Sequence, residues 1–394
     1  MRVVLTPARR YLISLWLAGI SLRITILAIP PALPVIHHSL RLSEAAVGAL
    51  TALPIFLLAV AAVPGSLLVS RLGPRRALMA GLLTVAAAGA LRGVGASAPI
   101  LFAMTVVMGV GISVSQPALP SLVRQWLPSR VGLATAVYSN GLLIGELISA
   151  ALTGAVLVWT GSWPSSVAVW SLFPLVALVL VFAGSRHVPL PQGQPRVRWW
   201  PDWTNPLTWR LGLILGSASI SYWGINAFVP DYLKVTHHAA LITPALTVIN
   251  FGQIPPSLLI GAFPHLFIAR RWPIAVAGGL TVLGALGMPL GGVSVVLLGG
   301  MLGFASAAIF VLALALPPLI AAPHDVHRVS AAMFTVSYTC PFIGSLLGGA
   351  FWDATGRPIA AFFPVALAGA LMVSLVAGLR FSRAEDVSEQ AHAV

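Results

Sequence analysis

Two charged side chains, Arg23 and Glu146, lie deep inside apolar stretches of this 394-residue chain. If the first stretch is a helix that begins at Tyr11, Arg23 lies about 18 Å along it, past the middle of a hydrocarbon core about 30 Å thick. A charge that faces lipid there costs at least about 2.5 kcal/mol, so we expect Arg23 to face a wet cavity or a partner. Its guanidinium offers a fork of donors that suits planar oxyanions and carboxylates. The alternative is a structural arginine that donates to backbone carbonyls near Pro30 and Pro31.

Glu146 is the second candidate for chemistry inside the membrane. It shares one face of a predicted helix with Ser139, Ser149 and Thr153. It is either a proton-coupling site or the counter-ion of Arg23. Alternatively, it lies near the outer membrane boundary as a solvated residue, or it bonds a neighbouring helix.

Further polar and aromatic side chains recur at helical spacing on several apolar stretches. The candidates for substrate binding are Tyr222, Trp223, Asn226, Asn250, Gln253, Gln116, Tyr138, Asn140 and Tyr338. Membrane helices also use such residues to bond one another, so each one alone fits packing as well as binding. Polar stripes on several different helices together favour a lined cavity.

The elements that must hold these residues are membrane helices. The chain is 58% hydrophobic and 8% charged, whereas a soluble domain carries roughly a quarter charged residues. The formal net charge of +13 comes from basic residues scattered through short loops between apolar runs. That pattern fits membrane orientation rather than nucleic-acid binding, so we expect a lipid bilayer and no nucleic acid among the partners.

Twelve apolar segments predict an all-α integral membrane protein of two pseudo-symmetric six-helix halves. The segments cover residues 11–36, 44–69, 77–95, 99–123, 131–159, 165–183, 209–233, 242–266, 274–290, 293–321, 329–351 and 359–379. Most are long enough to span a bilayer. We expect an N-terminal half over 1–183, a cytoplasmic loop over 184–206, a C-terminal half over 207–381 and a short polar tail over 382–394.

The basic residues predict the orientation of these helices. Most arginines fall on one side, and only Arg41, Arg92, Lys234 and Arg357 fall on the other. By the positive-inside rule both termini and the central loop are cytoplasmic. We expect a multi-pass protein of a bacterial inner membrane, working as a monomer.

The two halves show a weak internal repeat at an offset of about 199 residues. Pro7 matches Pro206 and Pro31 matches Pro230 in this register. The same register pairs Arg23 with Tyr222. Two parallel six-helix repeats are typical of transporters whose binding site lies between the halves, near the membrane midplane.

The loop SLLVSRLGPRR resembles the signature that follows the second helix in the major facilitator superfamily, a Gly-x-Leu-x-Asp-Arg-x-Gly-Arg-Arg pattern. Leu68, Arg71, Gly73, Arg75 and Arg76 match it, and Ser70 stands where the signature has aspartate. The resemblance implies the major facilitator fold and a gating role for Arg71, Arg75 and Arg76.

Within that superfamily, the chain is similar to the cyanate and 2-nitroimidazole transporter family. The similar stretches are Ser21–Arg23, Ala49–Pro54, Ala90–Arg92, Gln116–Arg124 and Tyr138–Ser139. The resemblance implies a secondary transporter for a small anion or compact polar planar solute, with Arg23 as main ligand. The alternative is a proton-coupled exporter of drugs or metabolites, with Glu146 carrying the proton.

Other classes of function find little support in the sequence. We see no Gly-rich phosphate loop with lysine and no nucleophile–base pair, so we expect neither ATP-driven transport nor enzymatic activity. His37–His38 and His237–His238 lack the carboxylate–histidine spacing of a metal site. We therefore expect no metal and no cofactor. A membrane sensor would need an appended soluble domain, which we do not expect here.

Overall fold

The computed structural model describes residues 6–184 and 199–378, and every regular element in these ranges is a helix. The first group consists of α1 (Pro7–Leu27), α2 (Ile29–Leu40), α3 (Glu44–Leu72), α4 (Pro74–Leu91), η1 (Val94–Ala96), α5 (Ala98–Trp126), η2 (Pro128–Arg130), α6 (Val131–Thr160), α7 (Trp163–Val169) and α8 (Leu172–Gly184). The expected tail over 382–394 lies outside the described residues.

The second group follows the central segment. It consists of α9 (Pro206–Val235), η3 (Ala239–Leu241), α10 (Ile242–Phe251), α11 (Ile254–Ala262), α12 (Pro264–Phe267), α13 (Trp272–Gly287), η4 (Met288–Leu290), α14 (Gly292–Ile320), α15 (Val326–Thr355), η5 (Pro358–Phe362) and α16 (Phe363–Ala377). The all-helical membrane fold predicted from the sequence is thus confirmed.

Among the described residues, eleven helical segments are long and apolar enough to cross a membrane. The twelfth predicted segment corresponds to α4, whose first turn carries Arg75 and Arg76. Three of the predicted spans are each divided into two or more α-helices, namely residues 11–36, 165–183 and 242–266. The first of them breaks at Ala28, between α1 and α2, because Pro30 and Pro31 have no amide hydrogen to donate to Ile26 and Leu27.

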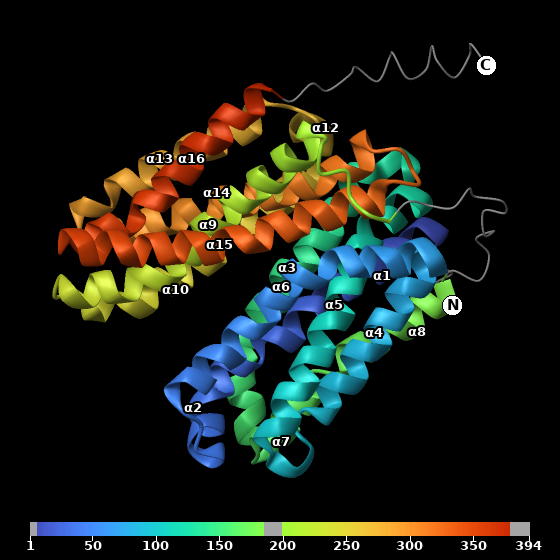
Figure 1. Ribbon diagram of the computed structural model, residues 1–394, viewed down its shortest axis with the longest axis horizontal. Coiled ribbons are helices and arrows are strands. Elements are labelled where there is room, and N and C mark those ends of the chain that lie inside the picture. The colour runs from blue at the N-terminus through green and yellow to red at the C-terminus, as the bar shows by residue number, and fades with distance from the viewer. Residues whose placement is uncertain (1–5, 185–198, 379–394) are drawn as a thin grey trace.

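The helices lie in two groups, with α1–α8 on one side and α9–α16 on the other (Figure 1). Within the groups, α1 packs on α6, α4 on α5, α9 on α15 and α13 on α16. Between the groups, α3 and α5 contact α15, and α6 contacts α11 and α14. The groups approach one another at the end where α1 begins, whereas α2 and α10 lie far apart at the opposite end (Figure 1).

Three glycines let α1 and α6 touch backbone to backbone. A Cβ at Gly19 or Gly141 would collide with the carbonyl oxygen of Tyr138 or Trp16, respectively. A Cβ at Gly145 would lie 2.6 Å from the carbonyl oxygen of Ile20. This close approach holds Arg23, on the next turn of α1, beside Glu146, the neighbour of Gly145 on α6.

We predict that Gly141→Ala destabilises the protein by about 1–3 kcal/mol, because a methyl group there overpacks two backbones that cannot separate cheaply. Thermal unfolding of the purified protein in detergent measures the effect as a lower midpoint. Gly154→Ala is the matched control on the same helix, since a Cβ there meets nothing within 4 Å. Equal midpoints for the two variants would contradict the backbone contact.

Candidate functional site

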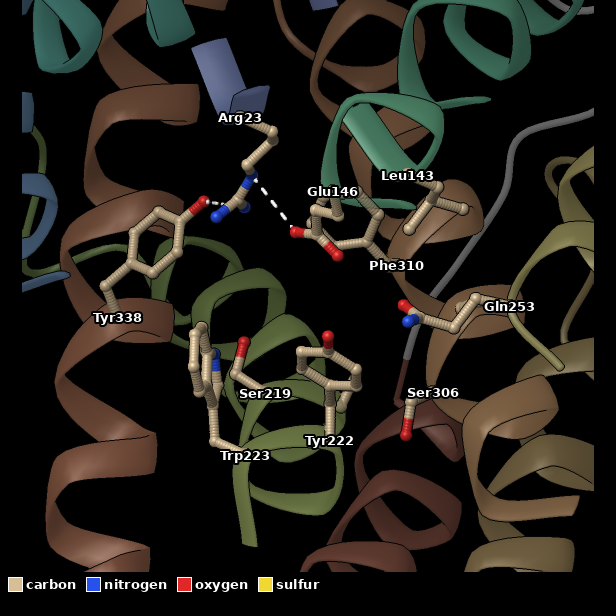
Figure 2. A pocket seen from close by; sticks show the side chains of 12 residues that line it. Arg23, Leu143, Glu146, Ser219, Tyr222, Trp223, Gln253, Ser306, Phe310 and Tyr338 are labelled. Atoms are coloured by element: carbon tan, nitrogen blue, oxygen red, sulfur yellow. Dashed lines mark hydrogen bonds and ion pairs between the residues drawn. The ribbon is translucent and has the colours of Figure 1, made fainter. Parts of the chain in front are cut away.

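A small cavity, of about 40 Å³, lies between the two groups of helices. Its lining residues are Arg23, Leu143, Glu146, Ala218, Ser219, Tyr222, Trp223, Gln253, Ser306, Ala307, Phe310 and Tyr338. Arg23 comes from α1 and Glu146 from α6, while the residues from Ala218 onward belong to α9–α16. Figure 2 shows their side chains converging on one space from several helices. A solute here would contact both halves at once.

Arg23 is the cation of this cavity, and its side chain is held by both halves. It is 6% exposed. Its Nη2 donates to the Tyr338 hydroxyl at 2.7 Å, and its Nε lies 3.5 Å from Oε1 of Glu146. Its Cζ also lies 5.7 Å from the centre of the Tyr338 ring. The structure thus brings together the two charged residues singled out in the sequence (Figure 2).

The Tyr338 hydroxyl joins α1, α5 and α15. It accepts from Arg23 at 2.7 Å and from Nε2 of Gln116 at 2.9 Å. A phenol accepts through its lone pairs and donates through its single hydrogen. With both lone pairs engaged, its hydrogen remains for an acceptor in the cavity. Arg23 and Tyr338 therefore present donors side by side, which suits an anion or a polar oxygen.

Tyr222 lines the same cavity, but it bonds elsewhere. Its hydroxyl donates to Oδ1 of Asn250 at 2.8 Å. Asn250 in turn donates to Oδ1 of Asn226 at 3.3 Å, and Nε2 of Gln253 lies 3.4 Å from Oδ1 of Asn250. Asn226 and Asn250 thus form a layer behind the cavity wall. Their role in this arrangement is to orient Tyr222 and Gln253.

Aromatic packing fixes the floor of the cavity in Figure 2. The rings of Tyr222 and Trp223 meet edge to face, with centroids 5.4 Å apart and planes at 74°. Such an arrangement is favoured by the ring quadrupoles. Ser306 and Phe310 also line the cavity. The sequence reading missed both because α14 is apolar around nearly its whole circumference, so periodicity marks no face.

Besides Asn226 and Asn250, three further sequence-predicted binding residues lie off the cavity. Tyr138 is buried against α1. Asn140 accepts from Nε1 of Trp16 at 3.0 Å and donates to Ser257 at 2.9 Å, so it links α6 to α11. Gln116 reaches the site only through Tyr338. In the described conformation these residues position helices instead of lining the solute space.

The arginines expected to form a gate lie where α3 turns into α4. Arg71 and Arg76 are exposed. Arg75 donates to the carbonyl of Phe182 at 3.3 Å, which ties α4 to α8 within the first group of helices. The turn between the helices is made by Gly73, whose φ of +78° favours glycine. A gating role for these residues stays a prediction.

Arg92 performs the structural role that the sequence left open for Arg23. Its side chain is fully buried, and its Nη2 donates to the carbonyl of Thr25 at 2.6 Å, beside the break between α1 and α2. Sequence reading placed Arg92 on the outer side of the membrane without a partner.

Metal-ligating residues do not gather in the part of the chain that the structure describes: no three His, Cys, Asp or Glu side chains there form a group that would hold an ion. The chemistry of the cavity comes from one guanidinium, one carboxylate, two phenols, an amide and two hydroxyls. Such a set of groups is chemically suited to binding and orienting a polar solute.

Known proteins are similar to this chain in sequence and in fold. The chain is 28% identical over 375 residues to the 2-nitroimidazole transporter of Escherichia coli (strain K12), covering 93% of this chain and 94% of that protein. It is 26% identical over 253 residues to the cyanate transport protein CynX of the same organism, covering 64% and 66%, respectively. The fold is similar to that of the human organic anion transporter MFSD10, with a TM-score of 0.77 at 16% identity, covering 94% of this chain and all of that one.

The family assignment rests on a match along most of the chain. The sequence pattern of the Major Facilitator Superfamily matches residues 15–344, a range that runs from α1 into α15 and contains every residue that lines the cavity. The relatives named above are transporters, as the resemblance in the sequence implies. The chain belongs to the Major Facilitator Superfamily, and it is a membrane transporter and not an enzyme.

Proposed function

We propose that this transporter moves a small anion or a compact polar planar solute, with Arg23 as its main ligand. The observation that carries the proposal is the position of the guanidinium. It is buried at a cavity between the halves and held by Glu146 of one half and Tyr338 of the other. Alternating access by rocking of two halves exposes such a midplane site to each side in turn.

The pairing of Arg23 with Glu146 gives the site little net charge. An incoming anion competes with the Glu146 carboxylate for the guanidinium. Protonation of Glu146 removes this competitor and leaves the positive charge of Arg23 for the solute. We therefore propose that one proton accompanies the anion and that Glu146 carries it.

The named solutes of the relatives support this size and chemistry. Cyanate is a small linear anion, and 2-nitroimidazole is a compact planar heterocycle. Both offer the acceptor atoms that adjacent donors on Arg23 and Tyr338 would engage. We propose Tyr222 and Gln253, which line the same cavity, as further ligands of the solute.

A second candidate function is proton-coupled export of a drug or metabolite, with Arg23 as a structural residue. The observation that favours it is that Arg23 already has protein partners in the described conformation. Oε2 of Glu146 is buried without a hydrogen-bond partner among the described residues. In this case the Glu146 carboxyl serves as a proton carrier, and the charge of Arg23 influences how readily it takes up a proton.

We further propose that the ends where α1 and α9 begin face the cytoplasm of a bacterial cell, with both termini on that side and the protein working as a monomer. The division of the described helices into α1–α8 and α9–α16 supports two six-helix halves (Figure 1). Contact between α6 and α12 near that end, with α2 and α10 apart, supports an outward-facing state.

A thermal-shift panel on the purified protein tests the proposal. We expect cyanate, nitrate and 2-nitroimidazole to raise the unfolding midpoint, because a ligand that binds the native state alone stabilises it by RT ln(1 + [L]/Kd). Tetraphenylphosphonium serves as the hydrophobic cation for comparison. A shift with this cation, and none with the anions, would contradict the proposal and favour the exporter.

A further inference from the structure

A second cavity, of about 480 Å³, adjoins the polar one. It is lined by Ile55, Phe56, Ala59, Val60, Trp223, Tyr338, Thr339, Pro341, Phe342 and Ser345. These residues come from α3, α9 and α15, where the two groups of helices meet. We call this space the apolar annex. Trp223 and Tyr338 line both the annex and the cavity that holds Arg23.

The two spaces differ sharply in chemistry. The polar cavity contains Arg23, Glu146 and Gln253. The annex is lined by no charged residue, and its only polar groups are two hydroxyls beside the shared Trp223 and Tyr338. Aliphatic and aromatic side chains form the rest of its wall. A charged group would lose its hydration in the annex without gaining a partner, whereas an apolar group would be favoured there.

Several side chains of the annex wall are exposed on the surface of the protein. Phe342 is 66% exposed, and Phe56 and Val60 are more than half exposed. They are therefore not committed to packing inside the protein. Tyr338 stands between the two spaces with its hydroxyl at Arg23 and its ring stacked on Phe334, at a centroid distance of 6.1 Å. A solute anchored at Arg23 would lie against this ring.

We propose, building on the proposed function, that the transported solute is an amphipathic monoanion. Its anionic group binds Arg23 and Tyr338 in the polar cavity, and its aromatic or branched apolar part occupies the annex beside Trp223 and Phe342. The single cation of the polar cavity matches one negative charge, and the uncharged annex disfavours a second. Aromatic carboxylates fit this description better than inorganic anions do.

The experiment compares two carboxylates with the same head group, acetate and benzoate. Titration calorimetry on the purified wild-type protein is expected to show benzoate binding at least tenfold more tightly than acetate. Phe342→Ala should reduce benzoate affinity by roughly tenfold, the scale set by a lost apolar contact in a pocket, and leave acetate affinity unchanged. Val60→Trp, which fills the annex, should act in the same direction.

Leu346→Ala is the matched control. Leu346 lies on α15 one turn beyond Phe342, is 62% exposed and does not line the annex. It should leave both affinities unchanged. Equal affinities for acetate and benzoate, or equal losses in the Phe342 and Leu346 variants, would overturn the annex proposal. So would co-purified lipid in the annex that benzoate fails to displace.

Failure of the annex and failure of the proposed function give different results. If acetate binds and its binding requires Arg23, the proposed function stands even when benzoate gains nothing. If neither carboxylate binds in a form that depends on Arg23, the proposed function itself fails. The Arg23→Ala variant, measured with both ligands, separates the two cases.

Discussion

Replacing Arg23 with alanine is expected to weaken anion binding by roughly 1.5–3 kcal/mol, the contribution of a hydrogen bond to a charged group. That loss corresponds to a roughly 10- to 150-fold higher Kd. The reason is that Arg23 is the one cation that lines the described cavity. Arg23→Lys keeps the charge and loses the planar fork, so we expect a substantial but smaller loss. Titration of cyanate onto the purified variants measures both.

The Arg23→Ala variant leaves Glu146 buried without its cation, and an unpaired buried charge is destabilising. The double variant Arg23→Ala/Glu146→Gln removes both charges and separates misfolding from loss of binding. Arg130→Ala is a control, because Arg130 is exposed and is not among the residues that line the cavity. A folded Arg23→Ala protein with wild-type affinity would show that the arginine is structural and would move the exporter to first place.

Replacing Glu146 with glutamine is expected to abolish the response of transport to a proton gradient. Glutamine keeps the size and polarity of the side chain and cannot take up a proton. Because the carboxylate competes for Arg23 at 3.5 Å, its removal should leave anion affinity unchanged or raise it. Uptake into proteoliposomes, with and without an imposed pH gradient, measures the coupling.

The sign of the pH effect follows from proton linkage. If each bound anion brings one proton to Glu146, wild-type affinity falls as pH rises, by up to about tenfold per pH unit. Glu146→Gln should give a flat profile over the same range. Asp231→Asn, a change at an exposed carboxylate on α9, should keep the wild-type slope. A full gradient response in the glutamine variant would refute the coupling role.

The sequence by itself determined the membrane class and the helical segments. Long apolar runs with few charges have one stable arrangement in lipid, because each helix satisfies its own backbone hydrogen bonds. The same physics singled out Arg23 and Glu146, since a charge placed so deep needs a partner or water. One of the alternatives left open for Glu146, the counter-ion of Arg23, is what the structure shows.

Only the tertiary structure decided which side chains meet. The repeat register paired Arg23 with Tyr222, but the phenol that bonds Arg23 is Tyr338, 315 residues away along the chain. Tyr222 turns its hydroxyl to Asn250 instead. Helical periodicity specifies the face on which a residue lies, but the rotation and depth of one helix against another come from packing. Here that packing includes the glycine contacts of α1 with α6, so the partners of Arg23 required the assembled bundle.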